Sequence, residues 1–154
     1  MEQPNLQFVF EIRIDVAGGK LPELGKTAKG VRKIVSILSG RFEGPEIKGI
    51  ILTGGYDWQL IRNDGVAEVE AHYVLKTDDD VLITITNKGL RHGTADAMQR
   101  IANGELVAPS EYYFRTSPVF ETAADKYDWL NKNIFIANGI RTPDQVLIQV
   151  WKVL

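Results

Sequence analysis

Residues 58–87 read WQLIRNDGVAEVEAHYVLKTDDDVLITITN and carry the clearest structural pattern of the chain. It holds runs in which apolar and polar residues alternate, separated by turn-forming segments at residues 63–65 and 77–80. Alternation with a period of two is typical of β-strands with one buried face. Strands joined by such short turns must be antiparallel, because a parallel connection needs a crossover of a dozen or more residues.

The first turn predicts a register for its two strands. Asp64-Gly65 favours a two-residue type I′ turn, because both central positions of that turn need a positive φ angle. With that loop, Trp58 would pair with Ala71 and share its inward face, while Asp57 would lie outward. The predicted inward set is Trp58, Leu60, Ala67, Val69, Ala71, Tyr73 and Leu75.

The second turn, at residues 77–80, allows more than one register. A loop of two or four residues would set Tyr73 opposite Thr84, and a three-residue loop would set it opposite Ile85. Only the three-residue loop keeps the apolar residues of both strands on one face, because a slip of one residue exchanges the two faces. Asn87 then points inward as well.

The inward face combines small residues with residues that carry polar groups. Ala67 and Ala71 leave volume, while Trp58, Tyr73 and Asn87 supply polar atoms. Ligand cavities are mostly apolar and hold a few placed polar groups, so this combination fits a cavity. A filled core with satisfied tyrosine and tryptophan is the alternative interpretation of the same pattern.

The rest of the chain also predicts mostly strands. Alternating or β-branched runs occupy residues 8–16, 32–38, 47–52, 134–137 and 145–153. One helix should begin after Thr94, a good N-cap, and end at Gly104, and a helical turn is expected in residues 123–131. We therefore predict a single all-β domain over residues 1–154, an antiparallel barrel of about eight or more strands that closes to remove its edges.

Composition excludes several classes of protein. The chain has 154 residues, a formal net charge of -2 and no cysteine. This charge does not suit a strongly basic nucleic-acid binder or a polybasic membrane anchor, so we expect neither partner. No apolar run approaches the ~18 residues of a membrane-spanning helix. The absence of cysteine rules out disulfides and thiolate catalysis and is compatible with a cytoplasmic protein.

Neither a cofactor nor a metal is expected from the motifs. Gly25-Lys26-Thr27 resembles the end of a phosphate-binding loop, but the position five residues before Gly25 is a lysine where that motif needs glycine. The acidic residues 78–80 lack the spaced ligands of a calcium loop. His72 and His92 are the only histidines, and they do not form a two-histidine helical motif.

Residues 112–116, YYFRT, form the densest aromatic segment. If this is a barrel strand, either Tyr113 with Arg115 or Tyr112 with Phe114 faces the interior. An inward Arg115 would be costly without an anionic partner. That partner would be a ligand carboxylate or enolate, or a protein carboxylate such as Glu121.

Four phrases of the sequence resemble an uncharacterised bacterial family, domain-of-unknown-function family 3237, also called uncharacterised protein family 0311. They are GRFEGPEIKGIILTGGYDWQLIRNDG, AHYVLKTDDDVLITITNKGLR, YYFRTSPVFET and YDWLNKNIFIANG. The resemblance implies an antiparallel barrel like those of the calycins and allene oxide cyclases, without a settled activity. The chain departs from the family where glycine usually follows an acidic turn, because Asp80 and Val81 stand there. Family-typical positions make these residues pocket candidates: Asp57, Trp58, Tyr73, Asn87, Tyr113, Arg115 and Glu121.

Three functional hypotheses follow. The first is a small barrel that binds a small, partly apolar, anionic organic molecule, with Arg115 on the anion and Asn87 or Asp57 setting its orientation. The second is a cofactor-free isomerase, cyclase or lyase that uses the same pocket, with Asp57 or Tyr73 as the acid/base group. The third is a structural module with a filled barrel, in which aromatic residues near Tyr127 and Trp129 seal a homo-oligomer.

Overall fold

The computed structural model describes residues 2–17 and 23–154. Its helical elements are α1 (Ala95–Ala102) and the 3₁₀ turns η1 (Pro109–Glu111) and η2 (Asp125–Leu130). Its strands are β1 (Leu6–Val16), β2 (Glu23–Thr27), β3 (Gly30–Glu43), β4 (Lys48–Ile51), β5 (Gly55–Ile61), β6 (Ala67–Thr77), β7 (Leu82–Gly93), β8 (Tyr112–Glu121), β9 (Phe135–Arg141) and β10 (Gln145–Val153).

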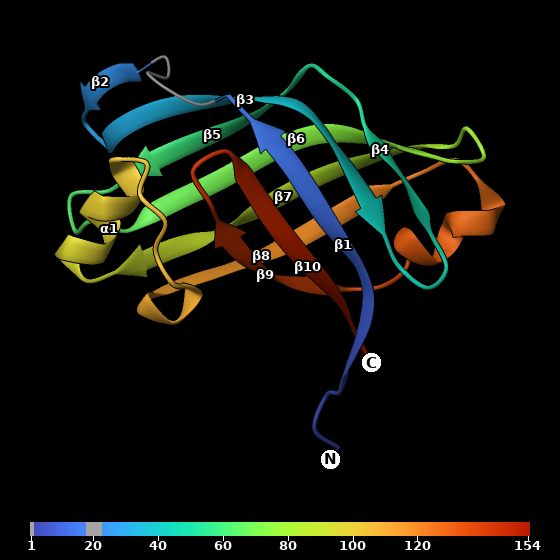
Figure 1. The fold of residues 1–154 in the computed structure, drawn as a ribbon. Coiled ribbons are helices and arrows are strands. Elements are labelled where there is room, and N and C mark those ends of the chain that lie inside the picture. Colours follow the sequence, from blue (N-terminus) through green and yellow to red (C-terminus); the bar gives the residue numbers. More distant parts are fainter. Residues whose placement is uncertain (1, 18–22) are drawn as a thin grey trace.

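The strands form a closed antiparallel barrel with eight strand positions, which confirms the predicted fold class. Strands β4 and β5 share one position, since each pairs with β3 on one side and β6 on the other. Pairing of β1 with both β10 and β3 closes the ring (Figure 1). Closure leaves fewer strand edges exposed, as the sequence argument required.

The β5–β6 hairpin corrects the predicted register. The Arg62 N–H donates to the Val66 carbonyl at 2.9 Å and the Gly65 N–H to the Arg62 carbonyl at 3.0 Å, which encloses a three-residue loop. Gly65 has a φ of 86°, as expected for a type I turn followed by a left-handed residue. Asp57, and not the tryptophan after it, therefore pairs with Ala71, and every β5 side chain lies on the face opposite to the prediction.

The β6–β7 hairpin confirms its predicted register. Tyr73 lies opposite Ile85, as a three-residue loop requires. The Thr77 N–H donates to the Val81 carbonyl at 2.9 Å, and the Asp80 N–H donates to the Thr77 carbonyl at 3.0 Å. Asp80 takes a φ of 65°, so it occupies the left-handed position that Gly65 fills in the preceding hairpin.

Strand β8 settles which side of the aromatic segment faces the interior. Tyr112, Phe114 and Thr116 are buried, whereas Tyr113 and Arg115 are exposed. The alternation is complete along β8, so the second of the two predicted arrangements is the observed one. Arg115 therefore does not point into the barrel, which was one of the two arrangements that the sequence allowed.

The helical segments also agree with the sequence, with one correction. The Thr94 side chain caps α1 by accepting the Ala97 N–H at 3.1 Å, and η2 provides the second helical turn. Tyr127 is buried, and its hydroxyl donates to Asp79 at 2.8 Å, so it does not offer an exposed surface for an oligomer. No helix among the described residues is long and apolar enough to cross a membrane.

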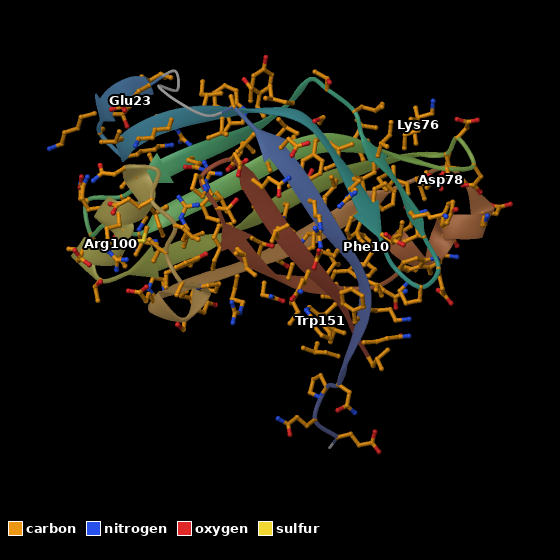
Figure 2. The ribbon with its side chains drawn as sticks, viewed as in Figure 1. Phe10, Glu23, Lys76, Asp78, Arg100 and Trp151 are labelled. Carbon is orange, nitrogen blue, oxygen red and sulfur yellow. The ribbon has the colours of Figure 1, made fainter. Side chains whose placement is uncertain are left out.

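The barrel interior has two unlike halves. At the end that carries the β6–β7 turn, Phe10, Phe42, Phe120 and Phe135 interlock, with ring centres 5.2–5.8 Å apart. Residues such as Leu75 are completely buried there. Figure 2 shows Asp78 of that turn and Arg100 of α1 at opposite ends of the barrel. The half nearer α1 holds the cavity described next.

Candidate functional site

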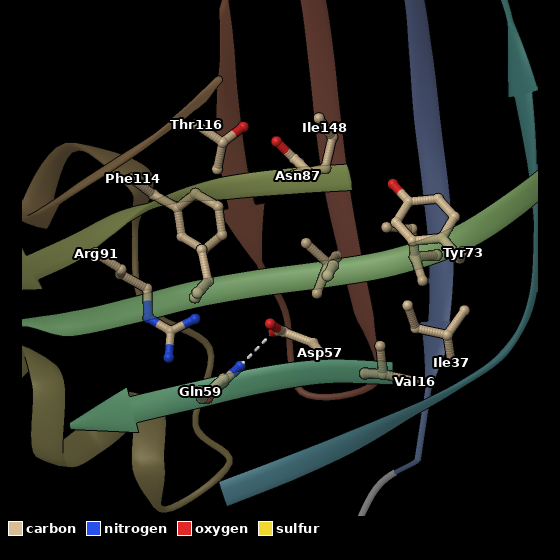
Figure 3. A pocket seen from close by; sticks show the side chains of 14 residues that line it. Val16, Ile37, Asp57, Gln59, Tyr73, Asn87, Arg91, Phe114, Thr116 and Ile148 are labelled. Carbon is tan, nitrogen blue, oxygen red and sulfur yellow. Dashed lines mark hydrogen bonds between the residues drawn. The ribbon is translucent and has the colours of Figure 1, made fainter. Parts of the chain in front are cut away.

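A small cavity lies in the half of the barrel away from the phenylalanine cluster. Its volume is about 40 Å³. One water molecule needs roughly 10–15 Å³ on this measure, so the cavity has room for about three. The apolar lining consists of Ile14, Val16, Ile37, Val69, Ala71, Phe114, Val146 and Ile148. The polar lining consists of Asp57, Gln59, Tyr73, Asn87, Arg91 and Thr116 (Figure 3).

Four of the polar lining residues carry a buried atom without a hydrogen-bond partner in the described protein. These atoms are Tyr73 Oη, Asn87 Oδ1, Arg91 Nε and Thr116 Oγ1. An unsatisfied buried polar group costs about 1–3 kcal/mol, and native proteins contain few of them. All four belong to residues that line this one space, and a water or another hydrogen-bonding molecule there would satisfy them.

Asp57 is the acidic group of the cavity. Its Oδ2 accepts from Gln59 Nε2 at 2.8 Å, the dashed contact in Figure 3, and its Oδ1 accepts the backbone N–H of Glu70 at 3.0 Å. Burial raises the pKa of Asp57 above its usual value, while these two hydrogen bonds act in the opposite direction. A carboxyl group with a raised pKa beside a cavity is suited to proton transfer.

Asp57 also lies at a local interruption of the β5–β6 ladder. Strands β5 and β6 pair at Asp57–Ala71 and again at Leu60–Glu68, but no residue pairing joins them in between. The Glu70 N–H, which lies in this gap, is satisfied by the Asp57 side chain. The carboxylate is thus held by the wall itself, as well as by Gln59.

Arg91 is the basic group of the cavity. Its guanidinium lies over the Phe114 ring, 5.4 Å from Cζ to the ring centre. Gly139 on β9 leaves room for that ring, because a Cβ there would lie 1.9 Å from it. Burial, with the nearby charge of Arg141, lowers the pKa of Arg91 to about 10, so Arg91 stays charged at neutral pH.

Tyr73 lies on the cavity wall next to the phenylalanine cluster. It is 4% exposed, and burial raises the pKa of its hydroxyl above its usual value, with the charge of Asp57 adding to the effect. The hydroxyl therefore stays protonated at neutral pH and can donate to a ligand oxygen. Asn87 and Thr116 are likewise buried on the neighbouring strands β7 and β8.

The structure brings together three of the residues predicted as pocket candidates. Asp57, Tyr73 and Asn87 line the cavity. For Tyr73 and Asn87 the inward position follows from the confirmed β6–β7 register. Asp57 is inward against the register argument, although the family resemblance had already made it a candidate.

The other four predicted pocket residues lie outside the cavity, and their placement was wrong. Trp58 is 43% exposed, because the β5–β6 loop has one residue more than predicted. Tyr113 and Arg115 are on the outer face of β8, where Arg115 Cζ lies 5.4 Å from the Tyr113 ring centre. Glu121 is exposed on the same face and forms no ion pair with Arg115 in the described chain.

The sequence argument missed Gln59, Arg91 and Thr116. Arg91 was within reach, since it follows the inward Asn87 by an even number of residues on the same strand. Thr116 belongs to the alternative face of the aromatic segment that had been left open. Gln59 lies on the same face of β5 as Asp57, so the one-residue error in the predicted register also placed Gln59 outward.

The fold and the site define a closed antiparallel barrel with a small, partly polar internal cavity. Among the described residues, no three histidine, cysteine or acidic side chains gather as metal ligands. The family model described as "Protein of unknown function (DUF3237)" matches residues 4–153. The chain belongs to this family.

Bacterial relatives share both sequence and fold with the chain. A UPF0311 protein of Rhodopseudomonas palustris is 38% identical over 151 residues, covering 98% of this chain and 99% of the relative. The crystal structure of a conserved protein of unknown function from the same species superposes with a TM-score of 0.95 at 36% identity, over 100% of both chains. These similarities show the family and the barrel fold, and they do not assign an activity.

A more distant likeness leads to a fungal enzyme. The hydroalkoxylation enzyme phnH of Penicillium herquei is 23% identical over 128 residues, covering 83% of this chain and 69% of the relative. The crystal structure of an enzyme from Penicillium herquei superposes with a TM-score of 0.72 at 19% identity, over 100% of this chain and 97% of that one. At this identity the structural likeness shows a shared fold.

Proposed function

We propose that the chain binds a small, partly apolar organic molecule in the barrel cavity. The observation that carries this proposal is that four residues with an unpartnered buried polar atom line one partly apolar space. A ligand with oxygen substituents on an apolar frame would satisfy these atoms and cover the aliphatic walls. An anionic group of the ligand would lie at Arg91, which lines the cavity, and not at the exposed Arg115.

A screen of small aromatic and polyketide-like acids by thermal unfolding tests the binding proposal. A ligand present at 100 times its Kd should stabilise the protein by about 2.7 kcal/mol. Thr116→Val, which removes a cavity hydroxyl at constant shape, should weaken the effect. Trp58→Ala, on the outer face, should leave it unchanged. Failure of every compound, or loss of binding in the Trp58 variant alone, would contradict an internal site.

A second candidate function is a cofactor-free isomerase, cyclase or lyase. The observation that favours it is Asp57, a carboxyl group with a raised pKa that lines the same cavity as a protonated tyrosine. Hydroalkoxylation, in the name of the fungal relative, adds an alcohol O–H across a carbon–carbon double bond. Within one molecule, Asp57 would accept the hydroxyl proton as the new C–O bond forms, and would return a proton to the other alkene carbon. Substrate and product are then isomers.

Alcohols and phenols that carry a conjugated alkene, incubated with the protein in D₂O, test this second function. Mass spectrometry should find cyclic isomers with one deuterium on carbon. Asp57→Asn should lower the rate by about 10²–10⁴-fold, the usual contribution of a general base. Since the base must be ionised, the rate should rise with pH through the raised pKa of Asp57. Equal rates for wild type and Asp57→Asn would exclude Asp57 from this role.

A further inference from the structure

Arg91 is a buried cation without an ion-pair partner among the described residues. Its side chain is 6% exposed, lines the cavity and has an Nε–H without an acceptor. No ion pair joins it to a carboxylate in the part of the chain that the structure describes. Residues 18–22 read GGKLP, so neither they nor Met1 contain an acidic side chain.

The charges near Arg91 do not form an ion pair with it. Arg141 on β9 is a second, half-buried guanidinium, and it is close enough to repel Arg91. Asp57 attracts both guanidiniums, and Asp144 also attracts Arg141. The two oxygens of Asp57 already accept hydrogen bonds from Gln59 and from the Glu70 backbone. Arg91 is therefore a buried cation without a directly bound carboxylate among the described residues, which is unfavourable unless an anion enters.

Arg91 lies nearer one end of the barrel than the other polar residues of the cavity. Arg91 follows Asn87 by four residues on β7, which spans roughly 13 Å at the usual rise of a strand. Tyr73 and Asn87 mark the inner part, and Arg91 lies toward the end near the β5–β6 turn, opposite Ala67. Aliphatic side chains such as Ile148 line the space between. Figure 3 shows the Arg91 guanidinium directed into this space.

We propose that the cavity takes small organic anions and that Arg91 binds their carboxylate or enolate oxygens. This inference rests on the proposed function and names its ligand class. The guanidinium lies over the Phe114 ring and presents a planar fork of N–H donors that matches a carboxylate. The ligand's negative charge would lie beside the buried guanidinium of Arg91, which forms no ion pair in the described part of the chain.

Arginine side-chain NMR on ¹⁵N-labelled protein tests the inference directly. Acetate and acetamide serve as probes of nearly equal shape that differ in charge, and both are small enough for a cavity of about 40 Å³. The Nε–H signal of Arg91 is assigned by its absence in Arg91→Gln. Acetate should shift this signal and bind at least tenfold more tightly than acetamide.

Variants separate a role in anion binding from a role in folding. Arg91→Gln should weaken acetate binding at least tenfold and leave acetamide binding within twofold of wild type. Arg91→Lys keeps a cation in place but loses the fork, so it should lie between the two and gives the same comparison if the glutamine variant does not fold. Arg115→Gln, an arginine on the outer face of the adjacent strand, should behave as wild type.

The two proposals fail in different ways. Equal binding of acetate and acetamide, or acetate binding that survives Arg91→Gln, would overturn the anion inference and leave the proposed binding function standing. If no probe, charged or neutral, perturbs the cavity residues, the proposed function falls together with the inference. An acetate-induced shift of the Arg91 signal that is lost in Arg91→Gln supports both.

Discussion

At the scale of single residues, polar groups that would bind a ligand in the cavity should lower the stability of the unliganded protein. Tyr73 and Tyr127 are both buried tyrosines, at 4% and 5% exposure. The Tyr127 hydroxyl donates to Asp79, whereas the Tyr73 hydroxyl has no partner among the described residues. The same chemical group is thus satisfied in the closed half of the barrel and unsatisfied where a ligand would sit.

Removing each hydroxyl should therefore have opposite effects on folding. Tyr73→Phe should raise the free energy of unfolding of the unliganded protein by about 1 kcal/mol, because an unsatisfied buried group disappears. Tyr127→Phe should lower it by about the same amount, because a hydrogen bond is lost and Asp79 loses a donor. Urea denaturation of both variants measures the difference, and a destabilised Tyr73→Phe would mean that its hydroxyl is already satisfied.

At the scale of elements, two neighbouring hairpins use the same three-residue loop with different residues at its last position. Gly65 has a φ of 86° and Asp80 a φ of 65°. Glycine adopts this left-handed region freely, whereas a residue with a Cβ is strained there, aspartate less than most. The second loop thus holds an aspartate where the first holds a glycine, without a change of loop length.

Exchanging the two residue types should reveal that strain. Asp80→Gly should stabilise the protein by about 0.5–1 kcal/mol, and Gly65→Ala should destabilise it by about 1 kcal/mol or more. Thermal unfolding at matched pH gives both values. A neutral or destabilising Asp80→Gly would show that the ion pair of Asp80 with Lys76, at 3.3 Å, outweighs the strain.

The same two hairpins show how far the sequence could lead. In β6 and β7 a wrong register would have buried threonines, so polarity selected the right loop. In β5 the apolar face with Trp58 and Leu60 agreed with the Asp-Gly signal, and both favoured a loop one residue too short. The face with Asp57 and Gln59 is inward because the cavity uses polar groups, so the usual rule of burying the apolar face fails at the site itself.

Asp79 of the β6–β7 turn forms side-chain hydrogen bonds with two residues of η2. This carboxylate accepts from Lys126 at 2.8 Å, Thr77 at 2.6 Å and Tyr127 at 2.8 Å. The hydrogen bond from Lys126, then those from Thr77 and Tyr127, lower the pKa of Asp79 below its usual value. The folded state therefore holds Asp79 ionised more strongly than the unfolded state does.

The pH dependence of stability should reflect this contact. A lowered folded pKa stabilises the protein above the unfolded pKa of about 3.9, and the gain is lost as pH falls through the folded value. Asp79→Asn should therefore destabilise the protein at pH 7, and its difference from wild type should vanish on acidification below that range. Asp78→Asn is the matched control, since Asp78 has only an exposed partner, Lys48, at 3.6 Å. Chemical denaturation across pH checks both, and a pH-independent difference would argue against ionisation as the cause.

At the scale of the whole molecule, the closed half of the barrel carries the packing and the other half carries the cavity. The alternation of strands predicted a barrel, and the barrel is confirmed. The division into halves was not predictable, because it depends on which inward residues of distant strands meet, as Phe10 meets Phe120 and Phe42. The alternation of residues within each strand predicts only that each of these side chains points inward.

Substitutions in the two halves should separate stability from binding. Phe10→Ala should cost about 3–5 kcal/mol, as for other fully buried phenylalanines. Ala71→Val, which adds volume beside the cavity, should change stability by less than about 1.5 kcal/mol and abolish or weaken ligand binding. Denaturation and ligand titration of both variants test this, and a large loss of stability in Ala71→Val would show that the space is too tight to be a site.

The interruption of the β5–β6 ladder gives Asp57 a part in the backbone structure as well as a place in the cavity lining. Its Oδ1 accepts the Glu70 N–H, which has no strand partner at that point. Protonation of that oxygen would weaken this hydrogen bond. The charge state of one side chain would thus determine whether a main-chain donor of β6 keeps its acceptor.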